Sequence, residues 1–470
     1  MDNYSVAQKV LNLKKIQPEL ALVQRGAKDA ALEKVAETIK SAKYKILEAN
    51  DLDVNCAIEA KQEDAFVARL RLDSEKIDDI TNKIVQVVRL EDPVGRVKRE
   101  WITPDNLKIK QVTVPLGTIS VIYESRPNVT VDAFSLAYKA GCPILLWSSS
   151  VGARTNNVLV DSIKVGLSEH GIPGAVELEI FSATTEVNSI LCKIDGIDAV
   201  LPRGRKALID RVVNNANVPA IETGEGNCHI YIEPSVCESE EDMKKTLEII
   251  DNAKSQKPEV CNAMETLLVH RDVVHVLMPH LAQLFKGKVE LRCDKTSYNA
   301  INPIPQGLEV KSATEKDWST EFLANILAIK TVNSIDDAIN HINTYGTKHS
   351  EAIITKDIES KKHFCNRVDA ACVYTNASTR LTDSGVFGFG AELGISTQKL
   401  HIRGPMGLEA LTTTKYHIEG SYHIRGRDTA KTESGGMQGM KINENANNPG
   451  DYIIMAPLDG KYDNSGLYIW

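Results

Sequence analysis

Short apolar segments alternate with helix-forming segments along the middle of the chain, and this alternation limits the possible folds more than any other feature. Between residues 119 and 375 the apolar segments include ISVIY, PILLW, HIYIE, ETLLVH and EAIIT, with helical periodicity between many of them. Strands that alternate with helices of ten or more residues form parallel sheets with right-handed crossovers. The pattern therefore predicts an α/β protein with two parallel-sheet domains, one on each side of about Glu233.

The composition excludes several classes of protein. The 470 residues carry a net charge of −8, without the basic stripe typical of nucleic-acid binding. No run reaches the roughly 18 apolar residues of a membrane span, and the first residues lack the apolar core of a signal peptide. We therefore expect a cytoplasmic protein. The nine cysteines form no Cys-x-x-Cys pair and the histidines show no ligand spacing, so no metal site is expected.

The two ends of the chain differ from the middle. Residues 1 to about 90 have the three- and four-residue apolar steps of helices, up to a break at Asp92-Pro93. Residues 427–470 are rich in Gly, Asn, Asp and Ser and have no sustained period. This composition predicts a disordered tail.

Cys261 is the cysteine whose surroundings most favour chemistry. It follows a charged helix and comes after Lys254 and Lys257, whose positive charges would favour the reactive thiolate. The alternative is a loop cysteine that packs under the strand ETLLV. Local spacing leaves both interpretations open.

Polar and glycine-rich loops follow several of the predicted strands. Asn128 could cap the next helix or donate to a developing oxyanion. Gly204 in LPRGRK and the glycines of ETGEGNC (residues 222–228) either bring the backbone close to a ligand or form ordinary turns. The glycine-dense stretch at residues 387–405 suggests a shaped loop.

Taken together, these segments resemble the gamma-glutamyl phosphate reductase family of the aldehyde dehydrogenase superfamily. VPLGTISVIYESRPNVTVDA, LPRGRKALI, VCNAMETLLV, VYTNASTRLTD, FGFGAELGISTQKLHIRGPMGLEALTT and YHIRG follow the family's order, over about residues 5 to 426. The resemblance implies an aldehyde dehydrogenase-like fold. It also implies NADPH-dependent reduction of L-glutamyl 5-phosphate to L-glutamate 5-semialdehyde with release of phosphate, the second step of proline synthesis from glutamate.

The same resemblance implies a domain organisation. Residues 1–233 would form the cofactor-binding domain, interrupted near 108–118 by an oligomerisation strand pair, and residues 234–400 the catalytic domain. Residues 401–426 would complete the oligomerisation element. The protein is then expected to act on a small molecule as a homo-oligomer, with no nucleic-acid or membrane partner.

The resemblance further assigns roles in catalysis. Cys261 would attack the acyl carbon and form a thioester, and Asn128 would stabilise the oxyanion together with the backbone N–H of Cys261. Glu222 stands about where the superfamily has its general base. A water-using aldehyde dehydrogenase therefore stays an alternative, and so does a non-catalytic protein on the same fold.

For the cofactor, the resemblance implies that Glu321 holds the nicotinamide ribose and that Gly204 and Arg205 lie near the pyrophosphate. Ser148 belongs to the same site and follows Trp147, where the family usually has a cation followed by two glycines.

That missing cation would contact the 2′-phosphate of NADP(H). NAD therefore stays possible, unless Arg154 or Lys206 supplies the charge.

The substrate carries a carboxylate and a phosphate, which arginine binds well by bidentate hydrogen bonds. Candidate substrate-binding residues within the matching motifs are Arg126, Arg380, His401 and Arg403. A structural salt bridge is the alternative role for each of them.

Overall fold

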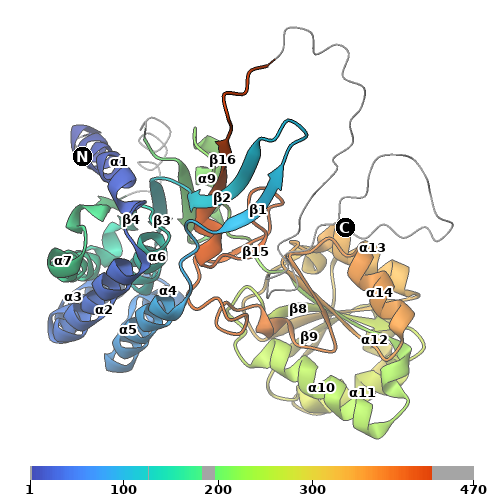
Figure 1. The fold of residues 1–470 in the computed structure, drawn as a ribbon. Helices are drawn as coiled ribbons and strands as arrows, with labels where there is room; N and C mark the ends of the chain where they lie inside the picture. Colours follow the sequence, from blue (N-terminus) through green and yellow to red (C-terminus); the bar gives the residue numbers. More distant parts are fainter. Residues whose placement is uncertain (1–2, 125, 183–195, 426–470) are drawn as a thin grey trace.

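The computed structural model describes residues 3–124, 126–182 and 196–425, which fold into two α/β units and a three-stranded antiparallel sheet (Figure 1). A further antiparallel pair consists of β14 (Ile395–Ser396) and β15 (Gly404–Pro405). The first unit has a parallel sheet with strand order β5-β4-β3-β6. The second has seven strands, in the order β10-β9-β11-β8-β7-β12-β13. The predicted fold class is thus confirmed. No helix in the described ranges is long and apolar enough to cross a membrane, and the cytoplasmic location stays a prediction.

The strands of the first sheet are covered on both faces, as expected for a parallel sheet between helices. Every residue of β3 and β4 is buried, which explains why both strands form continuous apolar runs in the sequence. Helices α6 and α7 make the crossovers from β3 to β4 and from β4 to β5. The elements are β3 (Ile119–Tyr123), α6 (Asn128–Lys139), β4 (Ile144–Ser149), α7 (Ala153–His170), β5 (Val176–Phe181), β6 (Ala199–Arg203) and α9 (Lys206–Asn215).

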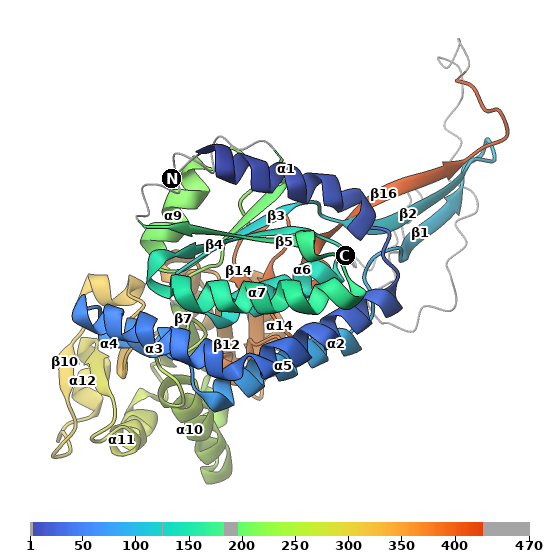
Figure 2. The ribbon, with the colours of Figure 1, turned by 90° about the vertical axis from the view of Figure 1, so that its left-hand side faces the viewer.

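The N-terminal region is helical, as the periodicity predicts. Figure 2 shows α1 on one face of the first sheet, and α2, α3 and α5 beside α7 on the other. Helices α2 and α7 approach closely because Gly166 has no side chain: a Cβ there would lie 2.7 Å from the Cα of Val35. The helices are α1 (Asn3–Leu20), α2 (Arg25–Ser41), α3 (Lys43–Glu59), α4 (Asp64–Leu70) and α5 (Ser74–Arg89).

The second sheet is parallel throughout its described strands. Its strands are β7 (Cys228–Ile232), β8 (Met264–His270), β9 (Glu290–Cys293), β10 (Val310–Ser312), β11 (Ile326–Val332), β12 (Ser350–Ile354) and β13 (Cys372–Thr375). Its helices are α10 (Glu240–Ser255), α11 (Val274–Leu284), α12 (Lys295–Ala300), α13 (Ile335–Tyr345) and α14 (Ile358–Arg367).

The sheets divide the chain at different positions from those expected. Strand β7 pairs with β8 and β12, so the chain enters the second sheet by Cys228, before the expected boundary at residue 233. Further on, Leu393, Met406 and Leu411 pack in the core of the first unit. The chain therefore returns to the first unit before the expected boundary at residue 400.

The three-stranded sheet joins distant parts of the chain. Strand β2 (Lys108–Pro115) pairs along its whole length with β16 (Thr412–Glu419) and also with β1 (Val97–Ile102). The sequence indicated β2 and the later segment as a joint element but not β1. The sheet projects from the first unit (Figure 1). The expected tail at residues 427–470 lies outside the described residues.

Trp147 lies in the core of the first unit. Its side chain is fully buried and packs in a cluster that includes Val6, Val10 and Leu13 of α1. The indole Nε1 has no hydrogen-bond partner among the described residues, which costs part of what burying the ring contributes. Trp147 therefore packs under α1, and the departure from the family pattern at this position is a packing feature.

Replacing Trp147 separates the stability gained by burying the ring from the cost of its unpaired N–H. Trp147→Ala should lower the free energy of unfolding by about 3–5 kcal/mol, because it removes a large buried ring. Trp147→Phe should cost clearly less, since it retains a ring and removes an unpaired N–H. Urea unfolding measures both, and equal stability of Trp147→Ala and the wild type would contradict this burial.

Candidate active site

Loops at the amino edge of the second sheet face loops at the carboxyl edge of the first sheet. On the second sheet, Cys261 lies in the turn directly before β8, and Glu321 lies in the loop before β11. On the first sheet, Asn128 begins α6 after β3, and Arg203 ends β6. Burial raises the pKa of the Cys261 thiol, and the nearby charges of Arg203 and Arg126 oppose that rise, so the two edges meet around this cysteine.

The Cys261 turn is held by its neighbours. The side-chain amide of Asn262 donates to the carbonyl of Thr382 at 2.8 Å, and the Thr379 hydroxyl donates to the carbonyl of Asn262 at 2.7 Å. Behind the turn, the thiol of Cys228 donates to the Cys261 carbonyl at 3.2 Å. These bonds fix the backbone of a half-buried cysteine and leave its own thiol without a hydrogen bond to any described residue.

The glycine loop at residues 222–228 touches this turn. A Cβ on Gly226 would overlap the carbonyl group of Cys261, so the two backbones are in direct contact. The N–H of Gly226 donates to a carboxylate oxygen of Glu321 at 2.7 Å. The close approach seen here is to the protein's own backbone, and approach of this loop to a ligand stays a prediction.

Burial raises the pKa of the Cys261 thiol to about 11, and the carboxylates of Glu321 and Glu392 act in the same direction. Arg203 and Arg126 oppose them. Against the sequence expectation, Lys254 does not act on the thiol: it is fully buried and pairs with Glu265 at 2.5 Å.

Glu265 also joins the Cys261 strand to the Glu321 loop. Its second carboxylate oxygen accepts from the backbone N–H of Leu323 at 3.0 Å. Burial raises the pKa of Glu265 and lowers that of Lys254, so removing either partner would leave a costly buried group.

Asn128 does not cap its helix. The N-cap position of α6 is Pro127, and no side chain caps it. The Asn128 amide donates instead to Asp132 at 3.1 Å, one turn further along the helix. The capping alternative is therefore wrong, and the oxyanion role stays a prediction.

The predicted cofactor residues of the first sheet are anchored by protein contacts. Glu124 accepts from the N–H of Arg205 at 3.1 Å, and the Arg205 guanidinium lies 5.6 Å from the centre of the Phe66 ring. A Cβ on Gly204 would lie 2.9 Å from the Glu124 carboxylate. Ser148 is buried and accepts from Asn156 at 2.5 Å.

Three of the four predicted substrate residues are engaged with the protein. Arg380 donates to Gln256 at 3.0 Å and also to Asn262. His401 lies 3.0 Å from the carbonyl oxygen of Ala410.

Arg403 pairs with Asp369 at 2.8 Å through Nη1, whereas its buried Nε and Nη2 have no hydrogen-bond partner among the described residues. Arg126 is different, because its side chain has no hydrogen bond or ion pair with a described residue.

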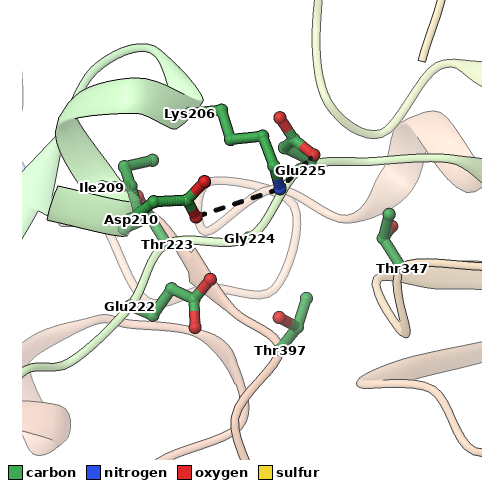
Figure 3. A pocket seen from close by; sticks show the side chains of 9 residues that line it. All are labelled: Lys206, Ile209, Asp210, Glu222, Thr223, Gly224, Glu225, Thr347 and Thr397. Atoms are coloured by element: carbon green, nitrogen blue, oxygen red, sulfur yellow. Dashed lines mark hydrogen bonds and ion pairs between the residues drawn. The ribbon is translucent and has the colours of Figure 1, made fainter. Parts of the chain in front are cut away.

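A cavity of about 220 Å³ lies beside the glycine loop (Figure 3). Lys206 pairs with Glu225 at 3.1 Å across it. Burial raises the pKa of Glu222, Asp210 adds to the shift, and Lys206 opposes it. The cavity is lined by Lys206, Ile209, Asp210, Glu222, Thr223, Gly224, Glu225, Thr347 and Thr397.

Arg203 was not predicted as a site residue. It lies within the LPRGRK segment, but its role depends on which loops face each other across the two sheets. The one signal for Arg203 in the sequence was its positive charge directly before Gly204.

Similarity to known proteins agrees with this geometry. A model of the aldehyde dehydrogenase family matches residues 304–416. A gamma-glutamyl phosphate reductase of Kosmotoga olearia is 45% identical over 422 residues, which is 89% of this chain and 99% of that protein. The chain belongs to the gamma-glutamyl phosphate reductase family. A member from Clostridium kluyveri is 45% identical over 429 residues, 90% of this chain and 100% of that protein.

Solved structures give the same result. The gamma-glutamyl phosphate reductase of Thermotoga maritima is 42% identical with a TM-score of 0.84, covering 89% of this chain and 99% of that one. An acetylating aldehyde dehydrogenase from Geobacillus thermoglucosidasius is 15% identical with a TM-score of 0.64, over 90% and 98% of the two chains. The latter likeness concerns the fold alone. Aldehyde dehydrogenases use nicotinamide cofactors, so a cofactor of this type is expected for the reductase family.

Gly226→Ala tests the contact between the two backbones. The new methyl group overlaps the Cys261 carbonyl, so we expect a loss of about 1–3 kcal/mol in the free energy of unfolding. Gly26→Ala is a matched control, because a Cβ at Gly26 meets nothing within 4 Å and α2 gains a better helix former. Urea unfolding of both variants measures the difference, and similar stabilities would contradict the contact.

The raised pKa of Cys261 predicts a steep pH profile. A pKa of about 11 leaves little thiolate at neutral pH, so the rate of alkylation by iodoacetamide in nucleotide-free protein should rise with pH up to at least pH 9. Mass spectrometry of the Cys261 peptide gives the rate. A plateau near pH 7 would show that the thiol is already ionised and that the arginines outweigh burial.

Proposed function

We propose that this protein reduces L-glutamyl 5-phosphate to L-glutamate 5-semialdehyde with NADPH and releases phosphate, the second step of proline synthesis from glutamate. The position of Cys261 supports this most strongly. A half-buried thiol lies where the edges of two sheets meet, beside arginines that suit an anionic substrate. Membership of the reductase family favours an enzyme over a non-catalytic protein.

Cys261 would act as the nucleophile. As the thiolate, its sulfur adds to the acyl carbon to give a tetrahedral species. The carbon–oxygen bond to phosphate then breaks, and the phosphate takes the electron pair. When bound, the nicotinamide supplies the hydride that reduces the thioester carbon. The carbon–sulfur bond then breaks to give the aldehyde. The Asn128 amide and the backbone N–H of Cys261 would stabilise the negative oxygen in both tetrahedral species.

The residues around the cavity fit the nicotinamide end of the cofactor. Asp210, Glu222 and Glu225 line it with one cation, Lys206. An acidic lining suits the nicotinamide ring, which is positively charged when oxidised, better than it suits phosphate groups. Glu321 lies on the adjacent loop and would bind the ribose.

The 2′-phosphate of NADPH requires a cation elsewhere. Trp147 is buried and cannot contribute. Arg154 lies in the first turn of α7, close after β4. Its side chain is 54% exposed although Asp53 lies 3.2 Å away. We infer that Arg154 binds the 2′-phosphate, with Gly204 and Arg205 at the pyrophosphate.

The three-stranded sheet supports assembly into a homo-oligomer. Strand β16 exposes Tyr416 and Ile418, at 56% and 61% of their full surface. Apolar side chains on a projecting sheet favour pairing with another copy of the chain.

A water-using aldehyde dehydrogenase is the second candidate, favoured by the raised pKa of Glu222. Such an enzyme needs a carboxylate base to activate water for thioester hydrolysis. Reduction of an acyl phosphate needs no water, because phosphate is already the leaving group.

Cys261→Ser tests the covalent step. Oxidation of glutamate semialdehyde by NADP⁺ in the presence of phosphate should slow by about 10³-fold or more, since the nucleophile is lost. Cys365→Ser is a matched control on α14, where serine can retain the contact with Thr375. Activity of Cys261→Ser near that of the control would remove Cys261 from the mechanism.

Glu222→Gln distinguishes the two candidate functions. The proposed reductase should depend on phosphate in the oxidative direction and lose less than about tenfold in kcat, because no water is activated. A water-using enzyme should act without phosphate and lose most of its activity in this variant. Oxidation that proceeds equally well without phosphate would contradict the proposal.

A further inference from the structure

Three arginines lie where the edges of the two sheets meet, and none of them has a bonded partner there among the described residues. The side chains of Arg69, Arg126 and Arg203 form no hydrogen bond or ion pair within the described ranges. Other arginines of the predicted site have ion-pair partners: Arg205 lies 3.5 Å from Glu124, and Arg403 lies 2.8 Å from Asp369. Unpaired guanidinium groups at a site are available for an anionic ligand.

The backbone places Arg126 and Arg203 next to each other. Arg203 is the strand partner of Tyr123, and its carbonyl accepts from the N–H of Glu124 at 3.2 Å. Arg126 follows two residues later in the same turn. The guanidinium of Arg203 packs directly against Gly394, where any Cβ would overlap it. Gly394 thus leaves room for the Arg203 side chain.

Arg69 approaches the same place from helix α4. The contact between Arg205 and Phe66 holds α4 against the turn that follows β6. Arg69 lies three residues after Phe66, on the same side of the helix. Burial lowers the pKa of Arg126 to about 10, and the nearby charges of Arg203 and Arg69 add to this effect. The three like charges therefore repel one another.

We propose that Arg126 and Arg203, with Arg69 beside them, bind the phosphate group of the acyl phosphate substrate. This rests on the function proposed above. In that substrate the phosphate is bonded directly to the carbon that the Cys261 sulfur attacks, whereas the carboxylate is at the far end of the carbon chain. Two or three guanidinium groups match the double negative charge and the bidentate geometry of phosphate.

The site also explains how the leaving group departs. When the carbon–oxygen bond breaks, its electron pair stays on the phosphate oxygen, and the arginines stabilise that charge. In the reverse direction, bound phosphate attacks the Cys261 thioester and the sulfur leaves with the electron pair. Arg380 and Arg403, which are engaged with the protein, are less suited to this role.

Kinetics in the oxidative direction test the assignment. Arg203→Gln and Arg126→Gln should each raise the KM for phosphate by about 10-fold or more, the loss expected for a hydrogen bond to a charged group. The KM for glutamate semialdehyde should change less than about twofold. Arg367→Gln is the control, because Arg367 is exposed on α14 and pairs with Asp336. A raised KM for the aldehyde with an unchanged KM for phosphate would overturn the proposal.

A second measurement requires no turnover. Inorganic phosphate should slow alkylation of Cys261 by iodoacetamide, and both glutamine variants should need about 10 times more phosphate than the wild type or Arg367→Gln. Equal protection in all four proteins would overturn the subsite.

Protection without any oxidation of glutamate semialdehyde would reject the proposed substrate and support the anion subsite. Thermal unfolding confirms that the variants fold. Arg203→Gln should not lower the midpoint, because it removes repulsion between like charges.

Discussion

The direct contact between the backbones of Gly226 and Cys261 is the constraint on which the site depends. A side chain at Gly226 would overlap the Cys261 carbonyl, so the approach requires glycine. The same glycine donates its N–H to Glu321. One residue thus fixes the distance between the nucleophile and the loop assigned to the nicotinamide ribose. The buried Lys254–Glu265 pair reinforces this arrangement, because Glu265 also holds the N–H of Leu323 in the Glu321 loop.

The charges around Cys261 oppose one another. Burial and two carboxylates keep the thiol protonated, whereas Arg126 and Arg203 favour the thiolate. A phosphate bound by the arginines would weaken their effect on the sulfur. The same groups would therefore place the leaving group and adjust the reactivity of the nucleophile, and a thiol with a raised pKa is protected from unwanted alkylation or oxidation.

The sequence predicts those parts that local patterns determine. Helical periodicity indicates the N-terminal helices, and apolar runs indicate strands such as β3 and β4. The order of the motifs identifies the family and, with it, Cys261. Strand β1 was missed because its short segment, VKREWI, shows little apolar alternation and is recognised by its pairing with β2.

Properties that depend on long-range contacts were not predictable. Lys254 is near Cys261 in the sequence, but its charge is neutralised by Glu265. Arg203 is distant in the sequence and acts on Cys261 because the edges of two sheets meet. Trp147 stands at a position expected to contact the cofactor and is instead packed under α1. In each case the residue contacts a side chain or group from another element, and the sequence around the residue does not indicate that contact.

Detection of the acyl enzyme tests the central claim most directly. The protein is mixed with glutamate semialdehyde and NADP⁺ in phosphate-free buffer, and peptides are analysed by mass spectrometry. We expect one glutamyl group on the Cys261 peptide, which persists without phosphate and disappears when phosphate is added. A glutamyl group on another cysteine, or none at all while NADPH is formed, would contradict it.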